Sequence, residues 1–314
     1  MDDFEVRHLK ESDIPDALEL MRESLGETAL LRRTPALFRW KHLQNPAGRS
    51  IMLVAEADDR LIGLRTFMRW RLELPGGGEL QCVRPVDTAT HPDYRRLGIF
   101  KTLTEAAVTE ARADGVHLIF NTPNPQSGAG YLKMGWTQVG PIGVLARPKL
   151  GLVKRRDTLN PSRTVDIDAE PVRPDRLPAW RSPLGLRTPR TTAYLTWRFN
   201  QHPTADYRMI MEAGGLAIVR PNSRHHRSEL LLCDMAGDIG PRVARAVVRR
   251  PGFAYVAAWF SRGTPERAAS IKAGIIPLPR VVALTLFARA LSPMEVNVAS
   301  LSSWDLALSD LEML

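Results

Sequence analysis

The residues best suited to chemistry form a basic turn between an apolar strand and a helix. The strand over residues 85–90 is followed by His91, and the segment Arg95-Arg96-Leu97-Gly98-Ile99-Phe100 then leads into the helix. The first N–H groups of a helix have no intrahelical partner, and together with the helix dipole they favour an anion there. Gly98 lets the backbone approach an anion closely, while Arg95 and Arg96 add positive charge. The turn predicts a phosphate site, the alternative being an ordinary helix start with two solvated arginines.

A second block of polar and aromatic residues follows one helix and one strand later. Asn124-Pro125-Gln126-Ser127 starts a helix, Tyr131 lies seven residues after Asn124, and Gly135-Trp136 follows the end of the helix. The phenol of a tyrosine is protonated at neutral pH, so it can serve as a general acid. The alternative for Tyr131 is a core aromatic residue on an amphipathic helix.

The two blocks together resemble the GNAT superfamily of N-acetyltransferases. The acyl-CoA motif of that family is Gln or Arg, two residues, Gly, one residue, and Gly or Ala, and the segment from Arg95 to Phe100 departs from it only at Phe100. The family's later pattern, Asn followed seven residues on by Tyr and then by a Gly-aromatic pair, is met by Asn124, Tyr131 and Gly135-Trp136. In element order the resemblance covers roughly residues 3–148.

The resemblance implies an acyl-CoA co-substrate, acetyl-CoA in the first instance, and no metal. The backbone of Thr88, Ala89 and Thr90 would pair with the pantetheine arm at the end of the strand. The pyrophosphate would lie on the turn formed by Arg95, Arg96, Leu97, Gly98, Ile99 and Phe100. Asn124 and Ser127 would line the thiol end of the acyl-CoA tunnel, and Tyr131 would protonate the departing CoA thiolate.

A direct attack by an amine also requires a group that takes the amine's proton. Asp87 and Glu56 lie in strands that the family places near the reaction centre, and Asp87 is the catalytic candidate. Either residue has the alternative of a solvated or paired strand carboxylate. No Ser-His-Asp or Cys-His set is suggested, which argues against a covalent acyl-enzyme.

The elements that must position these residues alternate between strands and helices. Strands are expected over 4–9, 51–55, 61–70, 79–90, 116–120 and 136–146, and helices from Ser12 onwards, over 94–114 and over 126–134. This order predicts a mixed α/β (α+β) domain in residues 1–150. Residues 151–190 are rich in Pro and Arg, which suits a linker or an irregular crossover.

Residues 191–314 repeat part of the first half. The segment Leu37-Phe38-Arg39-Trp40-Lys41 recurs as Tyr194-Leu195-Thr196-Trp197-Arg198, and Asp87 after an apolar run recurs as Asp234. We interpret these matches as an internal duplication, with chance similarity between α/β units as the alternative. The second half carries Asp238 where a phosphate turn would need arginine, so we expect two GNAT-like domains, the N-terminal one intact and the C-terminal one degenerate.

The composition of the chain limits which partners and which location we expect. The 314 residues carry a formal charge of +9, which raises nucleic acid, anionic membrane and polyanionic cofactors as partners. The arginines are scattered without interleaved aromatic residues, so neither nucleic acid nor membrane is expected, and the excess charge is interpreted as composition. Cys82 and Cys233 are expected to be buried thiols. The chain shows no signal-peptide pattern and no long apolar stretch, so a cytoplasmic location is expected.

The function predicted from these observations is transfer of an acetyl group from acetyl-CoA to a primary amine of a small molecule or sugar. One alternative is acetylation of a protein lysine or N-terminus. The other is a non-catalytic CoA-binding or scaffold protein, which the residue at Phe100 and the degenerate second half would suit.

Overall fold

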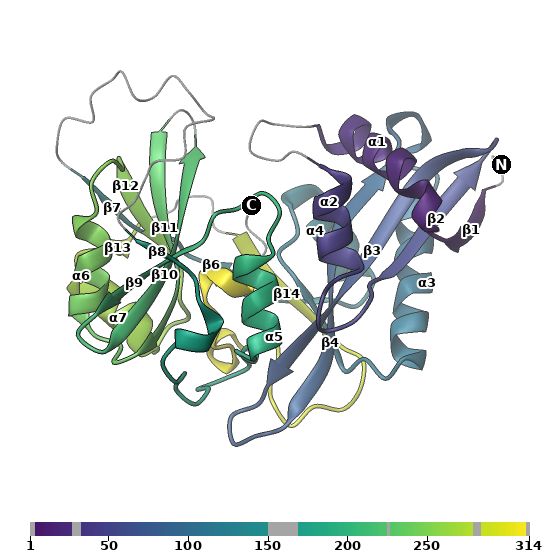
Figure 1. The fold of residues 1–314 in the computed structure, drawn as a ribbon. Coiled ribbons are helices and arrows are strands. Elements are labelled where there is room, and N and C mark those ends of the chain that lie inside the picture. Colours follow the sequence, from purple (N-terminus) through teal and green to yellow (C-terminus); the bar gives the residue numbers. More distant parts are fainter. Residues whose placement is uncertain (1–3, 27–32, 150–168, 225–226, 279–283, 312–314) are drawn as a thin grey trace. The chain divides into compact units, whose positions relative to one another are not determined.

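The computed structural model describes residues 4–26, 33–149, 169–224, 227–278 and 284–311. These residues form two compact units (Figure 1). Unit 1 comprises residues 1–72, 78–140 and 285–301, and unit 2 comprises residues 73–77, 141–284 and 302–314.

Unit 1 is built on a seven-stranded mixed sheet with the order β1-β2-β3-β4-β5-β14-β6. Its strands are β1 (Glu5–His8), β2 (Ile51–Ala57), β3 (Arg60–Glu73), β4 (Glu79–Thr90), β5 (Leu118–Asn121), β6 (Thr137–Ile142) and β14 (Leu284–Ala290). The β2–β3 turn contains Asp58 and Asp59, both with positive φ (50° and 57°), a conformation that aspartate tolerates and that a tight hairpin requires.

Helices cover both faces of this sheet. They are α1 (Ile14–Leu25), α2 (Pro35–His42), α3 (Ile99–Ala113) and α4 (Pro125–Lys133). Alternate residues of β2 face opposite sides, because side chains of a strand alternate. Ile51 and Leu53 pack in a core with α3 and α4, whereas Met52 and Val54 pack in a core with α1 and α2. The sheet is therefore buried between two helical layers.

Unit 2 repeats this architecture with a seven-stranded sheet of order β13-β7-β12-β11-β10-β9-β8. Its strands are β7 (Leu145–Pro148), β8 (Glu170–Pro171), β9 (Arg208–Glu212), β10 (Gly215–Arg224), β11 (Arg227–Gly237), β12 (Tyr255–Ala258) and β13 (Ile276–Pro277). Its helices are α5 (Thr192–Leu195), which continues as a π-helical turn (Thr196–Asn200), α6 (Pro241–Arg249) and α7 (Pro265–Lys272). The predicted mixed α/β fold with two related halves is thus confirmed.

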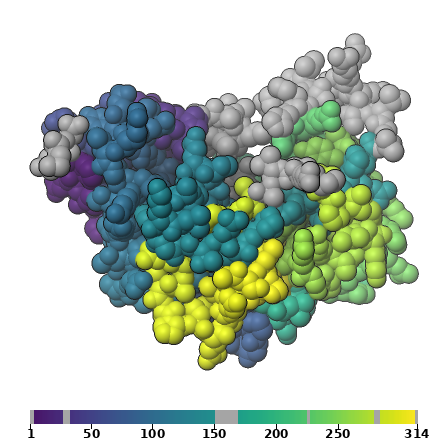
Figure 2. Space-filling view, turned by 180° about the vertical axis from the view of Figure 1, so that it is seen from behind, coloured from purple at the N-terminus to yellow at the C-terminus, as the bar shows by residue number. Residues whose placement is uncertain are grey.

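The two halves of the sequence exchange one strand. In the first sheet, the position between β5 and β6 is filled by β14, which pairs antiparallel with β5. In the second sheet, the position between β12 and β13 is filled by β7, which pairs antiparallel with both. Residues 285–301, which are coloured towards yellow in Figure 2, belong to unit 1 although the rest of that unit comes from residues 1–140. Each sheet is completed by a strand from the other half.

This exchange makes the compact units differ from the boundaries predicted at residues 150 and 190. Residues 141–149 and 169–190 belong to unit 2, and residues 285–301 belong to unit 1. Part of the predicted linker, residues 150–168, lies outside the described residues. The rest of it forms β8 and several buried positions around Arg187. The division of the chain into a catalytic and a degenerate domain remains a prediction.

The strand exchange predicts that residues 1–150 alone do not form a stable unit. They lack β14, so β5 loses a neighbour, and the core loses Phe287, which is 6% exposed. Thermal unfolding followed by circular dichroism should show no cooperative transition for this fragment. Fusing residues 284–301 after residue 150 through a Gly/Ser linker should restore one. A cooperative transition of the unfused fragment at the melting temperature of the full chain would contradict this view of the fold.

Candidate active site

The central strands of unit 1 separate at one end of the sheet. The parallel ladder between β4 and β5 joins only Cys82 to Leu118 and Val83 to Ile119. β4 then continues to Thr90, and Asp87 within it has a positive φ of 43°. A strand that leaves its neighbour turns backbone hydrogen-bonding groups toward the gap. This gap is where an extended ligand could pair with the strand.

The end of β4 holds the three residues predicted to meet the pantetheine arm. Thr88 accepts a hydrogen bond from Arg65, at 2.6 Å between Nη1 and Oγ1. Ala89 is buried against the α1 side of the sheet, and the backbone N–H of Thr90 donates to Ser24 Oγ over 3.3 Å. The three residues lie together in the sequence and in the strand, and their contact with a ligand remains a prediction.

The predicted phosphate turn leads directly into α3. Gly98 is the N-cap residue of α3 with a φ of 84°, and Arg96 also has a positive φ, 71°. The N-cap offers no side-chain hydrogen bond, so no capping side chain satisfies the first N–H groups of this 15-residue helix. Residues 95–98 are exposed, whereas Ile99 is buried and Phe100 half-buried in the core beneath α3. The turn has the geometry of an anion site.

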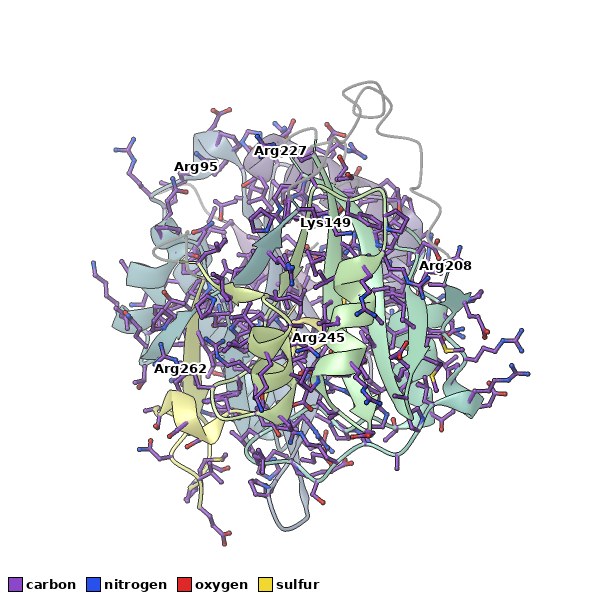
Figure 3. The ribbon with its side chains drawn as sticks, turned by 90° about the vertical axis from the view of Figure 1, so that its left-hand side faces the viewer. Arg95, Lys149, Arg208, Arg227, Arg245 and Arg262 are labelled. Carbon is purple, nitrogen blue, oxygen red and sulfur yellow. The ribbon has the colours of Figure 1, made fainter. Side chains whose placement is uncertain are left out.

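The positive charge of the chain is distributed unequally between the units. Unit 2 contains 24 Lys and Arg against 15 Asp and Glu, whereas unit 1 contains 19 of each. Exposed basic side chains such as Arg227, Arg245 and Arg262 belong to unit 2 (Figure 3). Unit 1 has no net charge to attract a phosphate. The attraction must therefore come from its local groups, which are Arg95, Arg96 and the start of α3.

Asn124 and Ser127 form the N-terminal cap of α4. The Asn124 side chain accepts from the Ser127 N–H over 2.8 Å, and Ser127 Oγ donates to Asn124 Oδ1 over 2.9 Å. The predicted tunnel residues thus have a structural role at the start of the helix that carries Tyr131. Their predicted place beside the thiol of CoA stays a prediction.

Tyr131 is held by a buried arginine. Its ring is 3% exposed and packs against Phe100 and Trp136, at centroid distances of 5.6 and 5.0 Å. Its hydroxyl oxygen accepts a hydrogen bond from Arg65 Nη2 over 2.8 Å. Arg65 also reaches Thr88, so one guanidinium joins α4 to the end of β4. Tyr131 is therefore a core aromatic residue whose hydroxyl group is linked through Arg65 to the separated strand.

Asp87 is bound by two side chains of α2. Its Oδ2 lies 2.9 Å from Lys41 Nζ and 3.0 Å from His42 Nε2. The other ring nitrogen of His42 lies 2.9 Å from Ser50 Oγ. Burial disfavours the ionised carboxylate, but the charge of Lys41 and the hydrogen bond with His42 outweigh burial and hold the pKa of Asp87 well below its usual range. Asp87 is therefore a fixed negative charge.

Glu56, the other carboxylate candidate, forms an ion pair with Arg7 at 2.5 Å. The half-exposed pair joins β1 to β2 and has the features of the paired strand carboxylate that the sequence left open as an alternative.

Cys82 and Cys233 are buried and free, and burial raises the pKa of both thiols, so neither suits nucleophilic catalysis.

Three residues of this cluster were not predicted from the sequence. Arg65 lies in an apolar strand, and Lys41 and His42 end a short apolar helix. A charged residue within an apolar strand was the one available signal for Arg65. Their bonds to Asp87, Thr88 and Tyr131 join residues that lie between 23 and 66 positions apart in the chain, a separation that no local pattern encodes.

Unit 2 has an aspartate at the equivalent place. Asp234 lies beside a bulge of β11, where the register against β10 shifts between Ile218 and Val219. Unlike Asp87, it is covered by Arg190 Nη2 at 2.8 Å and by Ser309 Oγ at 2.6 Å. Burial raises the pKa of Asp234 to about 6, against the opposing charge of Arg190.

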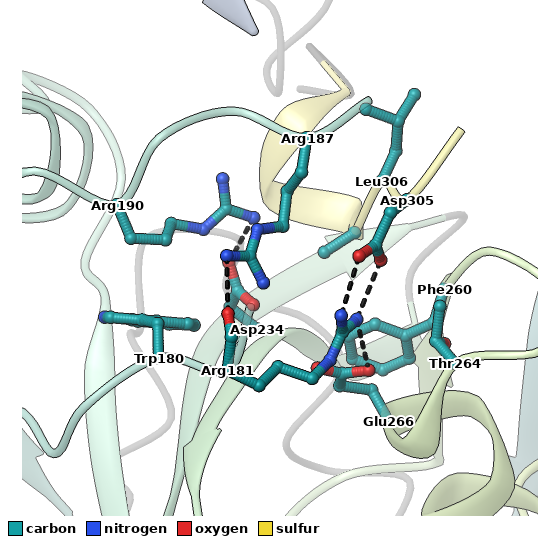
Figure 4. A pocket seen from close by; sticks show the side chains of 11 residues that line it. Trp180, Arg181, Arg187, Arg190, Asp234, Phe260, Thr264, Glu266, Asp305 and Leu306 are labelled. Carbon is teal, nitrogen blue, oxygen red and sulfur yellow. Dashed lines mark hydrogen bonds and ion pairs between the residues drawn. The ribbon is translucent and has the colours of Figure 1, made fainter. Parts of the chain in front are cut away.

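The chain's own C-terminal segment fills the region next to this aspartate. Ala307 bridges to Phe260 beyond the end of β12, and the Ser261 N–H donates to the Leu306 carbonyl over 3.0 Å. The small pocket that remains is lined by ion pairs, including Arg181 with Glu266 and Asp305 (Figure 4). A segment of protein thus lies in unit 2 where the equivalent strands of unit 1 separate.

The described residues contain neither a cluster of metal-binding side chains nor a membrane-spanning helix. No group of three or more His, Cys, Asp or Glu side chains in this part of the chain could hold a metal ion. Within the same residues, no helix is long and apolar enough to cross a membrane.

Comparison with protein families and solved structures identifies the fold. Residues 5–139 match the family model described as an acetyltransferase (GNAT) domain. A GCN5-related N-acetyltransferase from Kribbella flavida is 12% identical, with a TM-score of 0.60 over 92% of this chain and 71% of that chain. N-myristoyltransferase from Saccharomyces cerevisiae with bound myristoyl-CoA is 12% identical, with a TM-score of 0.60 over 92% and 83%.

A tandem GNAT protein from the clavulanic acid biosynthesis pathway is 14% identical, with a TM-score of 0.53 over 93% of this chain and all of that chain (100%). The comparison with curated protein sequences finds no match. The matched N-terminal region contains the separated strands, the turn before α3 and Tyr131, and the second sheet repeats the order of the first. Residues 5–139 therefore match an acetyltransferase (GNAT) domain, and the chain as a whole has the fold of solved GNAT and tandem GNAT structures.

Proposed function

We propose that unit 1 transfers an acetyl group from acetyl-CoA to a primary amine of a small molecule or sugar. The amine nitrogen attacks the thioester carbonyl, the C–S bond breaks, and the CoA thiolate takes the phenolic proton of Tyr131. The observation that carries this proposal is the position of the Tyr131 hydroxyl, 2.8 Å from Arg65, which also contacts Thr88 on the separated end of β4. A thioester whose pantetheine arm pairs with β4 would bring its sulfur toward that hydroxyl.

The turn before α3 would hold the pyrophosphate in this proposal. Its free N–H groups and the guanidinium groups of Arg95 and Arg96 are suited to phosphate oxygens. Phe100 occupies the last position of the motif, but its ring turns into the core beside Tyr131 and leaves the exposed backbone of the turn uncovered. Phe100 would therefore not block the backbone groups to which a phosphate would bind.

Asp87 is better suited to attract the acceptor amine through its negative charge than to take the amine's proton as a general base. A general base works best with a pKa near the operating pH, and the pKa of Asp87 is well below that. Its side chain is 20% exposed, so it can attract the ammonium form of the acceptor next to Thr88. The proton of the amine then leaves through water.

The phosphate turn is tested by replacing Gly98. In Gly98→Val, acetyl-CoA should bind at least about tenfold more weakly, because a β-branched residue resists the left-handed φ of 84° and narrows the approach to the N–H groups. A Cβ at Gly98 meets nothing within 4 Å, so the fold itself should persist. The measurement is the increase in melting temperature at millimolar acetyl-CoA.

Gly115→Val is the matched control for this test. Gly115 lies at the other end of α3 with a φ of 73° and an equally open surrounding. It should cost similar stability and keep the shift caused by acetyl-CoA. If acetyl-CoA leaves the wild-type melting temperature unchanged, the proposed function is wrong.

Tyr131→Phe should lower kcat by about 10²-fold or more, the usual contribution of a general acid. The KM for acetyl-CoA should change little, since the ring keeps its packing against Phe100 and Trp136. Thiol release with a panel of primary amines measures both constants. Tyr194→Phe removes a buried hydroxyl of unit 2 and should leave kcat unchanged. An unchanged kcat in Tyr131→Phe would reduce Tyr131 to a packing residue.

Asp87→Asn should raise the KM for the amine about tenfold or more and lower the free energy of unfolding by about 3 kcal/mol at pH 7, because the buried Lys41 then faces a neutral amide. The carboxylate stabilises the fold above its unfolded pKa near 4 and loses that contribution as pH falls toward its lower folded pKa. The difference in stability between wild type and variant, measured by urea unfolding, should therefore shrink between about pH 5 and pH 2.5.

Glu56→Gln serves as the control, since its half-exposed pair with Arg7 should be worth less than about 1 kcal/mol. It should leave the KM for the amine unchanged. A stability difference for Asp87→Asn that stays constant with pH would show that the carboxylate is not held ionised by its neighbours.

A further inference from the structure

Arg65 is a buried cation without a counter-ion among the described residues. Its side chain on β3 is 0% exposed. Its hydrogen bonds go to two neutral hydroxyl groups, Thr88 Oγ1 and Tyr131 OH, and its Nε has no partner in the described part of the chain. Burying a charge without a partner ion costs several kcal/mol. A packing role does not account for a guanidinium at this position, since an apolar residue would fill the strand without that cost.

Aromatic rings around the Arg65 guanidinium stabilise its positive charge in this buried position. The guanidinium carbon lies 5.0 Å from the centroid of Phe67, 5.3 Å from that of Phe100 and 5.2 Å from that of Tyr131. Ring faces attract a cation without neutralising it. The charge of Arg65 therefore stays available to an anion that forms nearby.

Phe100 belongs to this ring cluster, which gives a reason for its place in the motif. It meets Tyr131 edge to face, at 5.6 Å and 80°. The helix opposite makes room for it, because a Cβ at Gly130 would lie 3.0 Å from the Phe100 ring. The bulky residue therefore contacts both Arg65 and Tyr131 from the start of α3.

The hydrogen bond between Arg65 and Tyr131 also fixes the direction of the phenolic proton. A guanidinium only donates, so the Tyr131 oxygen is the acceptor in this bond. Its own O–H must then point away from Arg65. The second donor of Arg65 holds Thr88, so the hydroxyl is set relative to the strand that would hold the thioester.

We propose that Arg65 is the positioning residue that makes Tyr131 an effective proton donor to the departing CoA thiolate. When Tyr131 gives up its proton, a phenolate forms 2.8 Å from the guanidinium, and the uncompensated charge of Arg65 stabilises it. The proton moves from the Tyr131 oxygen to the thiolate sulfur, and solvent returns a proton to Tyr131 afterwards. This inference rests on the proposed function of Tyr131 and adds the group through which that residue works.

The test combines Arg65→Met and Arg65→Lys with Tyr131→Phe in the full chain. Arg65→Met should lower kcat about 10²-fold, while the KM for acetyl-CoA stays within about threefold, because the lost interaction acts in the transition state. Arg65→Lys keeps the charge without the planar fork, so it should recover part of the loss. In the Tyr131→Phe background, Arg65→Met should cost nothing further, as expected for residues that act as one unit.

Arg84→Met is the matched control. Arg84 is also buried, on β4, with its guanidinium over the rings of Trp70 and Phe120. Its replacement should lower the stability of the protein. Any effect that it has on kcat should multiply with the effect of Tyr131→Phe on kcat. Equal kcat losses in Arg65→Met and Arg84→Met, or a full additional loss in the double variant, would overturn the proposal.

A spectroscopic measurement separates this inference from the proposed function. The ¹³Cζ resonance of Tyr131, identified by its loss in Tyr131→Phe, should shift in Arg65→Met and stay in place in Arg84→Met. If wild type acetylates no amine, the proposed function fails, while the resonance still decides whether Arg65 controls the Tyr131 hydroxyl. An unmoved resonance in Arg65→Met excludes that control.

Discussion

The separation of β4 from β5 is the constraint on which the site depends. After Val83 the strand no longer pairs with β5, and Asp87 has a positive φ of 43°, which is unusual within a strand. Such an arrangement needs support from the surrounding elements. Lys41 and His42 of α2 hold it from one side through Asp87, and Arg65 holds it from within the sheet through Thr88. The polar network thus replaces the ladder that the strand has given up.

The two halves share one fold but differ in the region beside the aspartate of the fourth strand. Both have an aspartate near an irregularity of the fourth strand, but Asp234 is enclosed by Arg190 and Ser309. The segment around Leu306 lies along Ser261 and satisfies the backbone groups that a ligand would otherwise meet. In the second half, internal ion pairs therefore lie in this region, and those of Arg181 with Asp305 and Arg190 with Asp310 hold the segment around Leu306.

The sequence predicted many of the strands and helices, but it did not predict which strands and which side chains pair with one another. Alternation of apolar residues predicted the strands, the Gly98 turn predicted the start of α3, and the repeat of Trp40 as Trp197 pointed to two related halves. It did not show that β14 belongs beside β5, because strand pairing depends on contacts distant in the chain. For the same reason the pairing of Arg65 with Tyr131 could not be foreseen, although Tyr131 belonged to a motif that the sequence showed.

The exchanged strand has a consequence for synthesis on the ribosome. When residue 150 has been made, six of the seven strands of the first sheet exist, but β14 is still missing. At about 5–20 residues per second, the roughly 140 residues up to the end of β14 take on the order of ten to thirty seconds. Through that interval β5 keeps an unpaired edge, of the kind that invites aggregation. The second sheet has no such delay, since β7 precedes its other strands and its last strand, β13, ends at residue 277, so the sheet whose synthesis begins first is the sheet that receives its last strand later.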